Sequence, residues 1–185
     1  NPGQCINYVS CHDNYTLWDK LRFSCSKSPD SDLRRMAKLA GALILTSQVI
    51  PFLHSGMEFC RTKGGNHNSY KSPDSVNQID WSRKREYRDV YEYYKSLICL
   101  RRDHPAFRIS DQKSIQQYIR FFTEYRSGIV GYSIDGAALG DPWKNIIVIF
   151  NGNGEELTVS LPEGEFQIMA GGDEIKEEGF NEFVS

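Results

Sequence analysis

The sequence lacks several features that would assign it to common classes of protein. It contains no apolar run approaching the roughly 20 residues that a helix needs to cross a bilayer. Lys and Arg number 22 and Asp and Glu number 24, so the formal net charge of -2 leaves no basic excess for nucleic acid. We therefore expect no membrane and no nucleic acid among its partners. With 39% hydrophobic and 25% charged residues, the 185-residue chain has the composition of a globular fold.

The cysteines also lack the spacing of a disulfide framework or a zinc site. Their number is odd and no pair has CxxC spacing; they are Cys5, Cys11, Cys25, Cys60 and Cys99. No other cluster of metal-binding residues stands out, so we expect no metal and no cofactor. The odd count favours a cytoplasmic or otherwise reducing compartment.

The chain begins with neither an initiator Met nor a signal peptide. Its first residues are Asn1-Pro2-Gly3-Gln4, and a strand pattern starts by residue 6. We expect a part of a longer polypeptide, with the remainder of that polypeptide as a partner.

The first half of the sequence predicts strand, helix, strand. Apolar runs at residues 6–9 and 49–53 read as strands, and the second is apolar throughout, as strands covered on both faces are. A helical stripe between them predicts a helix from an N-cap at Ser31 or Asp32 to about Thr46. A short helix is expected over Leu17–Leu21. A longer one should run from about Tyr87 to Asp103, because His104-Pro105 disfavours its continuation.

The second half of the sequence has the period of antiparallel strands. Val130, Tyr132 and Ile134 alternate, and residues 146–150 form an apolar run. The turn signal at residues 151–154 is followed by a second alternation over residues 157–161. The fold class is therefore α/β followed by a small antiparallel β-sandwich, with the boundary at about residues 105–113.

Two stretches carry side chains suited to binding polyols. His12, Asp13 and Asn14 follow the first strand, and α/β barrels place their chemistry at the C-terminal ends of parallel strands. The loop over residues 60–79 has no periodicity, and a loop of this length in a compact domain is usually functional or disordered. Its amides and guanidinium suit sugar hydroxyls; the candidates are Arg61, Asn66, Asn68 and Tyr70. The alternative is that the His-Asp pair caps a turn and the loop residues are ordinary structure.

These stretches resemble a known family. Residues 9–14 (Val-Ser-Cys-His-Asp-Asn) with 16–19 (Thr-Leu-Trp-Asp) are similar to the fourth signature region of the alpha-amylase superfamily in its pullulanase form. Residues 51–59, 61–70, 72–81, 104–108 and 143–152 extend the similarity, and the pattern over 61–81 is the most specific part. The chain thus resembles the C-terminal portion of type I pullulanases over nearly its whole length.

The resemblance implies a fold. Residues 1–108 would be the final β/α units of a (β/α)8 barrel, with strand seven at 6–9 and strand eight at 50–53. Residues 109–185 would be a C-terminal β-sandwich domain. Two positions depart from the family: Val49 stands where Gly is usual, and Met57 where Gln or Asp commonly precedes Glu58.

The resemblance also implies a function, which is retaining hydrolysis of alpha-1,6 glucosidic linkages in pullulan and branched alpha-glucans such as starch or glycogen oligosaccharides. The nucleophile and the acid/base would follow strands four and five, outside this chain, so the chain alone is expected to be inactive. Asp13 would stabilise the transition state and His12 would bind the sugar at subsite -1. Asn14, Arg61, Asn66, Asn68 and Tyr70 would contact substrate.

Other interpretations stay open at this point. The chain could be the same portion of an isoamylase or glycogen-debranching enzyme, a non-catalytic carbohydrate-binding module, or a structural piece. A binding module would need an exposed aromatic platform in the β half, where the sequence offers Trp143 and scattered tyrosines. Glu58 as a second catalytic carboxylate would make the chain a self-contained glycosidase, although a structural role fits it better. We expect Trp18 and Trp81 to be buried, and His54 to be a structural residue whose hydrogen bonds are satisfied.

Overall fold

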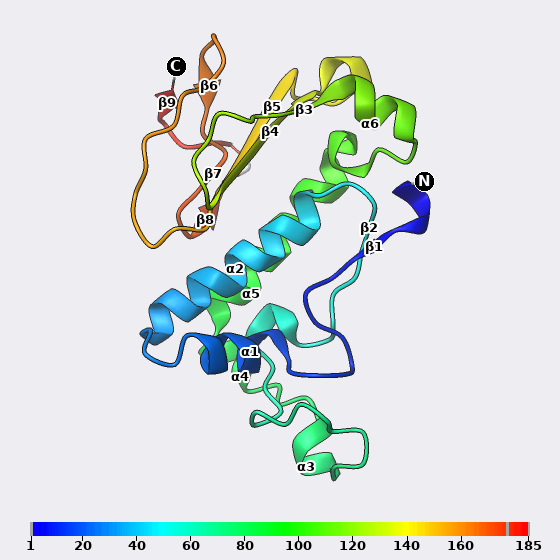
Figure 1. Cartoon of the computed structure of the whole chain (residues 1–185), viewed down its shortest axis with the longest axis vertical. Helices are drawn as coiled ribbons and strands as arrows, with labels where there is room; N and C mark the ends of the chain where they lie inside the picture. Colours follow the sequence, from blue (N-terminus) through cyan, green and yellow to red (C-terminus); the bar gives the residue numbers. More distant parts are fainter. Residues whose placement is uncertain (1, 177, 185) are drawn as a thin grey trace.

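Two long helices lying side by side form the centre of the molecule (Figure 1). The structure is a computed structural model and describes residues 2–176 and 178–184. Helix α2 spans Asp30–Thr46 and α5 spans Arg88–Asp103. The two helices approach closely because Gly41 has no Cβ, which would lie 2.4 Å from Tyr94 Cζ. The Tyr94 hydroxyl donates to the carbonyl of Ala37 at 2.9 Å, so its buried polar atom is satisfied.

Both long helices confirm the predictions made from the helical periodicity of the sequence. The predicted end of the second helix at Asp103 is correct. The predicted N-cap of the first was wrong, because the helix already begins at Asp30 and Pro29 occupies the cap position without a side-chain hydrogen bond. Asp30 and Asp32 instead lie in the first turn, where carboxylates interact favourably with the helix dipole.

A two-stranded parallel ribbon lies beside these helices. It pairs β1 (Ile6–Asn7) with β2 (Ile50–Pro51), and α2 lies between them in sequence, which confirms the strand-helix-strand order. Both strands are shorter than predicted. Ile6 and Ile50 are 57% and 47% exposed, so the second strand is not covered on both faces by the described residues, contrary to its apolar pattern. Each strand has one partner among the described residues, and their assignment as strands seven and eight of a barrel stays a prediction.

Short elements precede, connect and follow the ribbon and the long helices. They are η1 (Pro2–Gln4), α1 (Leu17–Ser24), η2 (Met57–Phe59), α3 (Asp74–Asn77), α4 (Arg83–Glu86) and η3 (Pro105–Arg108). Helix α1 confirms the predicted short helix, and α3 lies within the long loop over residues 60–79.

The second half of the chain forms small antiparallel sheets, as the alternation predicted. The main sheet has the order β3-β4-β5, with β3 at Ile119–Phe121, β4 at Ile129–Asp135 and β5 at Asn145–Asn151. Two further pairs follow, β6 (Phe166–Gln167) with β9 (Phe183–Val184) and β7 (Ala170–Gly171) with β8 (Glu174–Ile175). The connection between β4 and β5 contains η4 (Ala137–Leu139).

Two predictions in this half were wrong. Residues 157–161 form no strand, because alternation makes a strand only where a partner supplies hydrogen bonds. The turn at Asn151 exists, but the Asn151 side chain closes it by bonding Glu155 O and Asn153 N, and no hairpin follows. Helix α6 (Gln112–Tyr118) was not predicted, although Asp111 caps it by accepting from Ser114 N at 2.8 Å.

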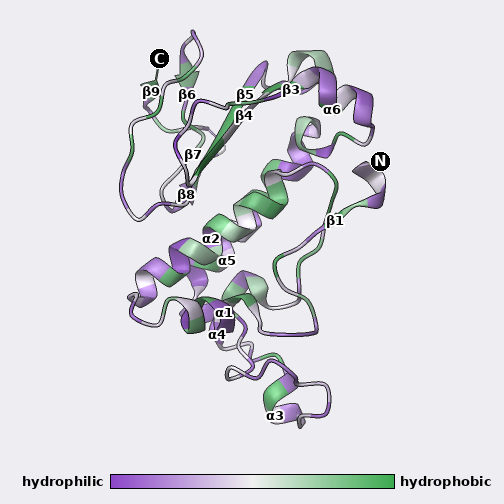
Figure 2. Cartoon of the chain, viewed as in Figure 1, coloured by the Kyte–Doolittle hydropathy of each residue, from purple (hydrophilic) through white to green (hydrophobic). Residues whose placement is uncertain are grey.

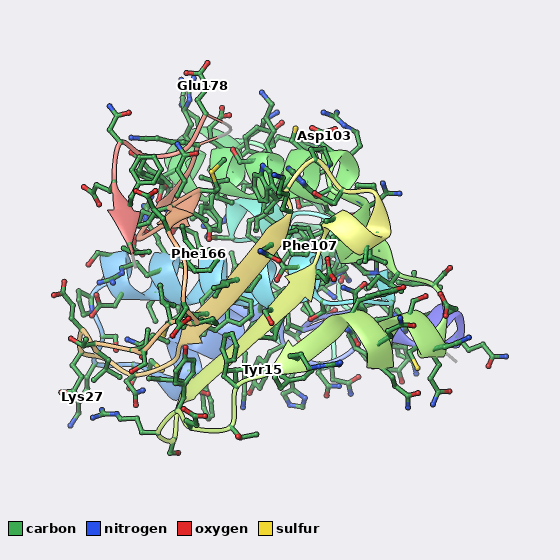
Figure 3. The ribbon with its side chains drawn as sticks, turned by 90° about the horizontal axis from the view of Figure 1, so that it is seen from above. Tyr15, Lys27, Asp103, Phe107, Phe166 and Glu178 are labelled. Atoms are coloured by element: carbon green, nitrogen blue, oxygen red, sulfur yellow. The ribbon has the colours of Figure 1, made fainter. Side chains whose placement is uncertain are left out.

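One hydrophobic core joins the helices to the β3-β4-β5 sheet. Figure 2 shows hydrophobic residues along β4 and β5 and through the middle of α2. Figure 3 shows the side chains between the helices and these strands, with Phe107, which is buried, labelled among them. The Tyr132 hydroxyl of β4 donates to Thr46 O at the end of α2. Asp141, before β5, lies 2.7 Å from His104 Nδ1 and accepts from Ala106 N.

Arg101 of α5 ties the end of α2 to the start of β2. Its guanidinium is buried and donates to four backbone carbonyls at 2.7 to 2.9 Å, those of Leu45, Ser47, Val49 and Phe107. The Leu45, Ser47 and Val49 carbonyls lie where α2 ends and the chain turns toward the ribbon, and the Phe107 carbonyl lies in η3. The last carbonyls of a helix have no partner within it, and Arg101 supplies one. One side chain therefore fixes the path from α2 into β2.

Val49 adopts a left-handed backbone conformation on this path. Its φ is +82°, a region that costs a residue with a Cβ about 1–2 kcal/mol and that suits glycine. The resemblance described above expects Gly at this position, and the backbone angle supplies the physical reason. The Arg101 contact to the Val49 carbonyl holds the chain in this conformation.

Replacing Val49 with Gly should stabilise the fold. We expect the free energy of unfolding to rise by about 0.5–1 kcal/mol, because the relieved strain exceeds the extra entropy of Gly in the unfolded chain. Urea denaturation of Val49→Gly measures this, and Val49→Ala is the control that keeps the Cβ and should give no gain. A Gly variant as destabilised as the Ala variant would contradict the strain argument.

Candidate functional site

The candidate site begins where the chain leaves β1. Ser10 and Thr16 are buried on either side of an exposed turn, and Thr16 Oγ1 accepts from Asp19 N at 3.1 Å to cap α1. Asn14 has a φ of 63°, which Asn tolerates better than most residues. Between these anchors the side chains of His12 and Asp13 are 85% and 69% exposed, with His12 Nε2 lying 3.3 Å from Asp13 Oδ2. The structure thus places an imidazole and a carboxylate together at the surface.

Lys63 fixes the backbone of this turn from the long loop. Its ammonium donates to the carbonyl of His12 at 3.1 Å and to Ser69 Oγ at 2.7 Å. The side chain is buried, and burial lowers the pKa of Lys63; the nearby Arg61 charge lowers it further, while Asp13 and Asp19 act in the opposite direction. Lys63 therefore joins the turn that carries His12 to the loop that carries Ser69.

Asp19 anchors the same loop to α1. It is buried, and its two carboxylate oxygens accept from the Thr62 hydroxyl and, at 2.8 Å, from Lys63 N. Because both oxygens are occupied, Asp19 is a structural carboxylate and its contacts set the starting point of the loop.

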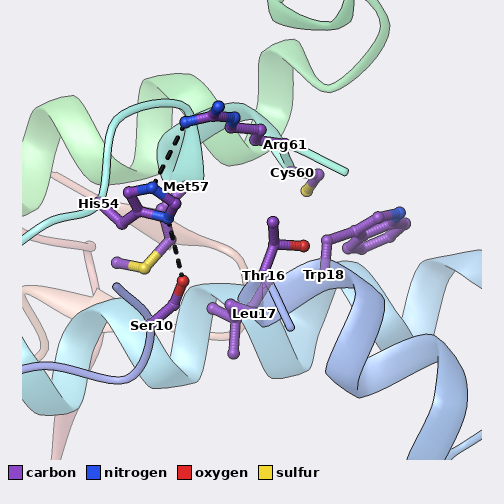
Figure 4. Close-up of a pocket in the computed structure, with 9 residues that line it drawn as sticks. Ser10, Thr16, Leu17, Trp18, His54, Met57, Cys60 and Arg61 are labelled. Atoms are coloured by element: carbon purple, nitrogen blue, oxygen red, sulfur yellow. Dashed lines mark hydrogen bonds between the residues drawn. The ribbon is translucent and has the colours of Figure 1, made fainter. Parts of the chain in front are cut away.

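Arg61 and His54 connect the loop to the end of β1 (Figure 4). Arg61 Nη1 donates to Ser55 O at 3.1 Å and lies 3.4 Å from His54 Nε2, while Nη2 donates to Asn77 O. His54 Nδ1 lies 3.3 Å from Ser10 Oγ. Both ring nitrogens of His54 thus have hydrogen-bond partners, as predicted. The Arg61 guanidinium is directed at protein atoms.

A small cavity lies between these residues. Its volume is about 10 Å³, roughly the room of one water molecule, so it does not accommodate a sugar ring. Figure 4 shows its lining, which comes from the segments after both strands, from α1, α2 and η2, and from the loop after η2. It includes Ser10, Thr16, His54 and Arg61. Among the described side chains, Arg61 Nε is buried without a hydrogen-bond partner.

The remaining loop residues differ in how strongly they are held. Asn66 Nδ2 donates to Ser72 Oγ, and Asn66 Oδ1 accepts from Asn68 N, so these amides shape the loop. Tyr70 is 72% exposed. Within the described residues, no hydrogen bond or ring contact joins Asn68 or Tyr70 to His12 or Asp13.

Sequence reasoning missed Lys63 and Asp19 and misjudged Trp81. Lys63 reads as a solvated loop residue, and its burial depends on tertiary contacts that local sequence does not reveal. Trp18 is 2% exposed as predicted, but Trp81 is 67% exposed, because it packs one side against Phe59 and leaves the other in solvent. Glu58 Oε2 accepts from Gly56 N at 3.0 Å, so this carboxylate bonds its own turn.

In residues 2–176 and 178–184, no group of three or more His, Cys, Asp or Glu side chains could hold a metal ion. No helix in the same residues has the length and hydrophobicity to cross a membrane.

Comparison with known proteins connects this geometry to one family. Residues 115–174 match the family described as "Pullulanase, all-beta domain". The pullulanase of Bacillus subtilis (strain 168) is 42% identical over 161 residues, which is 87% of this chain and 22% of that protein.

Solved structures give the same result. A pullulanase from Bacillus acidopullulyticus superimposes with a TM-score of 0.94 and 45% identity, covering 99% of this chain and 22% of that one. Type I pullulanase from Bacillus subtilis str. 168, complexed with maltose, has a TM-score of 0.92 and 38% identity and covers 99% of this chain and 25% of that one. The chain spans about a quarter or less of the length of these relatives. By sequence and by structure, the chain is homologous to a segment of the pullulanases.

Proposed function

We propose that this chain is the C-terminal portion of a type I pullulanase, in which it helps to hydrolyse alpha-1,6 linkages of pullulan and branched alpha-glucans. The observation that carries the proposal is the exposed His12-Asp13 pair at the end of β1, within a chain homologous to pullulanases. In this proposal residues 1–108 belong to the (β/α)8 barrel, with β1 and β2 as strands seven and eight. Residues 109–185 form the β-sandwich domain.

Asp13 acts on the sugar and not on the scissile bond in this proposal. A sugar hydroxyl that accepts from His12 Nε2 and donates to Asp13 Oδ2 would join both side chains, which already lie 3.3 Å apart. A carboxylate held against the ring hydroxyls at subsite -1 gains strength as the ring flattens and acquires positive charge. Such a gain lowers the barrier because it is larger in the transition state than in the ground state.

The nucleophile and the acid/base would come from the rest of the longer protein. Retaining hydrolysis needs two carboxyl groups about 5 Å apart and free to react. Asp19 and Glu58 are bonded to backbone and hydroxyl groups of their own surroundings, which argues against either as the missing partner of Asp13. A self-contained glycosidase built on Glu58 is therefore disfavoured.

The alternatives have less support. Trp143 does not offer a flat exposed platform, because its ring lies 3.7 Å from the ring of His104. This disfavours a carbohydrate-binding module in the β half. An isoamylase and a pullulanase each match 87% of this chain, but the identity is 26% to the isoamylase and 42% to the pullulanase, which favours pullulanase over isoamylase.

Asp13→Asn in the intact protein should lower kcat for pullulan by about two to four orders of magnitude and change KM far less. The amide keeps the shape of the side chain but loses the negative charge that favours the transition state. Asp111→Asn, which alters an exposed helix cap far along the chain, is the matched control and should keep normal turnover. Near-normal turnover by Asp13→Asn would remove Asp13 from the mechanism.

Tyr70→Ala should weaken binding of a branched malto-oligosaccharide, because the exposed ring and hydroxyl are proposed to contact the glucan. The expected rise in Kd is about three- to tenfold, the range of one lost hydrogen bond or ring contact. Isothermal titration calorimetry with Tyr70→Phe as the second variant separates the ring from the hydroxyl. Unchanged affinity in both variants would assign Tyr70 to loop structure alone.

A further inference from the structure

His54 connects Arg61 to Ser10 across the ends of the two ribbon strands. Its Nε2 lies 3.4 Å from Arg61 Nη1 and its Nδ1 lies 3.3 Å from Ser10 Oγ (Figure 4). Ser10 is buried and stands two residues before His12. The ring therefore contacts the segment that leads directly to the candidate site.

These two contacts determine which nitrogen of His54 carries the proton. A guanidinium can only donate, so Nε2 must be the acceptor in its contact with Arg61. A neutral imidazole then carries its proton on Nδ1 and donates it to Ser10 Oγ. Protonation at Nε2 would place two N–H donors and two positive charges against each other and would break the contact with Arg61.

The charges around His54 favour this neutral form. Burial lowers the pKa of His54 from its ordinary value of 6.5, and electrostatic interaction with Arg61, Lys63 and, least, His12 lowers it further. These groups reach the ring from the loop after η2 and from the turn after β1. The neutral ring is thus maintained above pH 6.5 and is lost as the pH falls through the lowered pKa.

We propose that neutral His54 is a positioning residue for the turn at residues 10–14, holding Ser10 so that His12 and Asp13 face the glucan. Lys63 holds the same turn at the His12 carbonyl, so the turn is attached at two points to the region that follows β2. Small displacements of a group that must meet a transition state cost up to about a hundredfold in rate. Loss of the His54 contact should therefore reduce kcat more than it raises KM.

The test rests on the proposed function and uses the intact protein with pullulan as substrate. Ser10→Ala removes the acceptor on the turn while leaving the His54 ring, and His54→Phe removes both contacts while keeping a ring. Each should lower kcat about ten- to a hundredfold with KM within about threefold. The double variant should have a kcat no lower than that of the poorer single variant, because both changes break the same contact between His54 and Ser10. Ser26→Ala, at an exposed serine outside the turn, is the matched control.

A pH profile separates positioning from simple loss of packing. His54→Gln keeps an acceptor that can reach Arg61 and has no proton to gain, so it should recover most of the kcat lost in His54→Phe. The Gln variant should also retain more of its pH-7 activity below pH 6 than the wild type, because protonation of His54 no longer weakens the attachment.

Two results would overturn the inference, and each is distinguishable from failure of the proposed function. Normal kcat in both Ser10→Ala and His54→Phe, with Asp13→Asn inactive in the same assay, would leave the function standing and remove His54 from it. If the wild type and His54→Gln lose the same share of their pH-7 activity below pH 6, the proposal that neutral His54 holds the turn is likewise contradicted. Full activity of Asp13→Asn would instead remove Asp13 from the mechanism, and with it the role of the turn on which the inference rests.

Discussion

The placement of the candidate site depends first on the hydrogen bonds that Arg101 donates to four backbone carbonyls. The end of α2, the approach to β2 and the segment η3 all lose their regular hydrogen-bond partners at one place, and a single buried guanidinium supplies them. A buried charge is costly unless its donors are used, and here the carbonyls solvate it while it satisfies them. Gln48 adds a second connection, since its side chain donates to Ala106 O and accepts from Ile109 N. Val49 keeps its left-handed backbone conformation because these hydrogen bonds hold the chain on both sides of it.

From this fixed point the chain passes through β2 to the residues that hold the turn after β1. His54 and Lys63 follow β2, and their partners Ser10 and the His12 carbonyl follow β1. Arg61 also follows β2 and contacts His54. The parallel pairing of the two strands brings these groups to the same end of the ribbon. The polar groups nearest the turn thus hold its backbone and Ser10, and the His12 and Asp13 side chains stay exposed to solvent, where a ligand can reach them. Rigid support around an exposed pair is the arrangement that favours a precise site.

The parts of the fold that the sequence predicts are those governed by local periodicity. The stripes of α2 and α5 and the alternation in β4 identify these elements because each buries one face against the common core. The same reasoning fails at residues 157–161, where alternation exists without a pairing strand, and at Trp81, whose ring is only partly covered by Phe59. It also misses Arg101 and Lys63, because long cationic side chains ordinarily reach solvent and only tertiary contacts show that these two are buried. The position of His12 and Asp13 after a strand was predictable, whereas their support by distant residues was not.

The central claim is that the region after β2 serves the site by positioning the turn that carries Asp13. A double-mutant cycle between Lys63→Met and Asp13→Asn, measured as kcat/KM on pullulan in the intact protein, tests it most directly. If Lys63 acts through the turn, its substitution should cost about tenfold or more beside Asp13 and almost nothing once Asp13 is already Asn. Equal losses from Lys63→Met in both backgrounds would show that Lys63 contributes independently of Asp13 and would contradict the account.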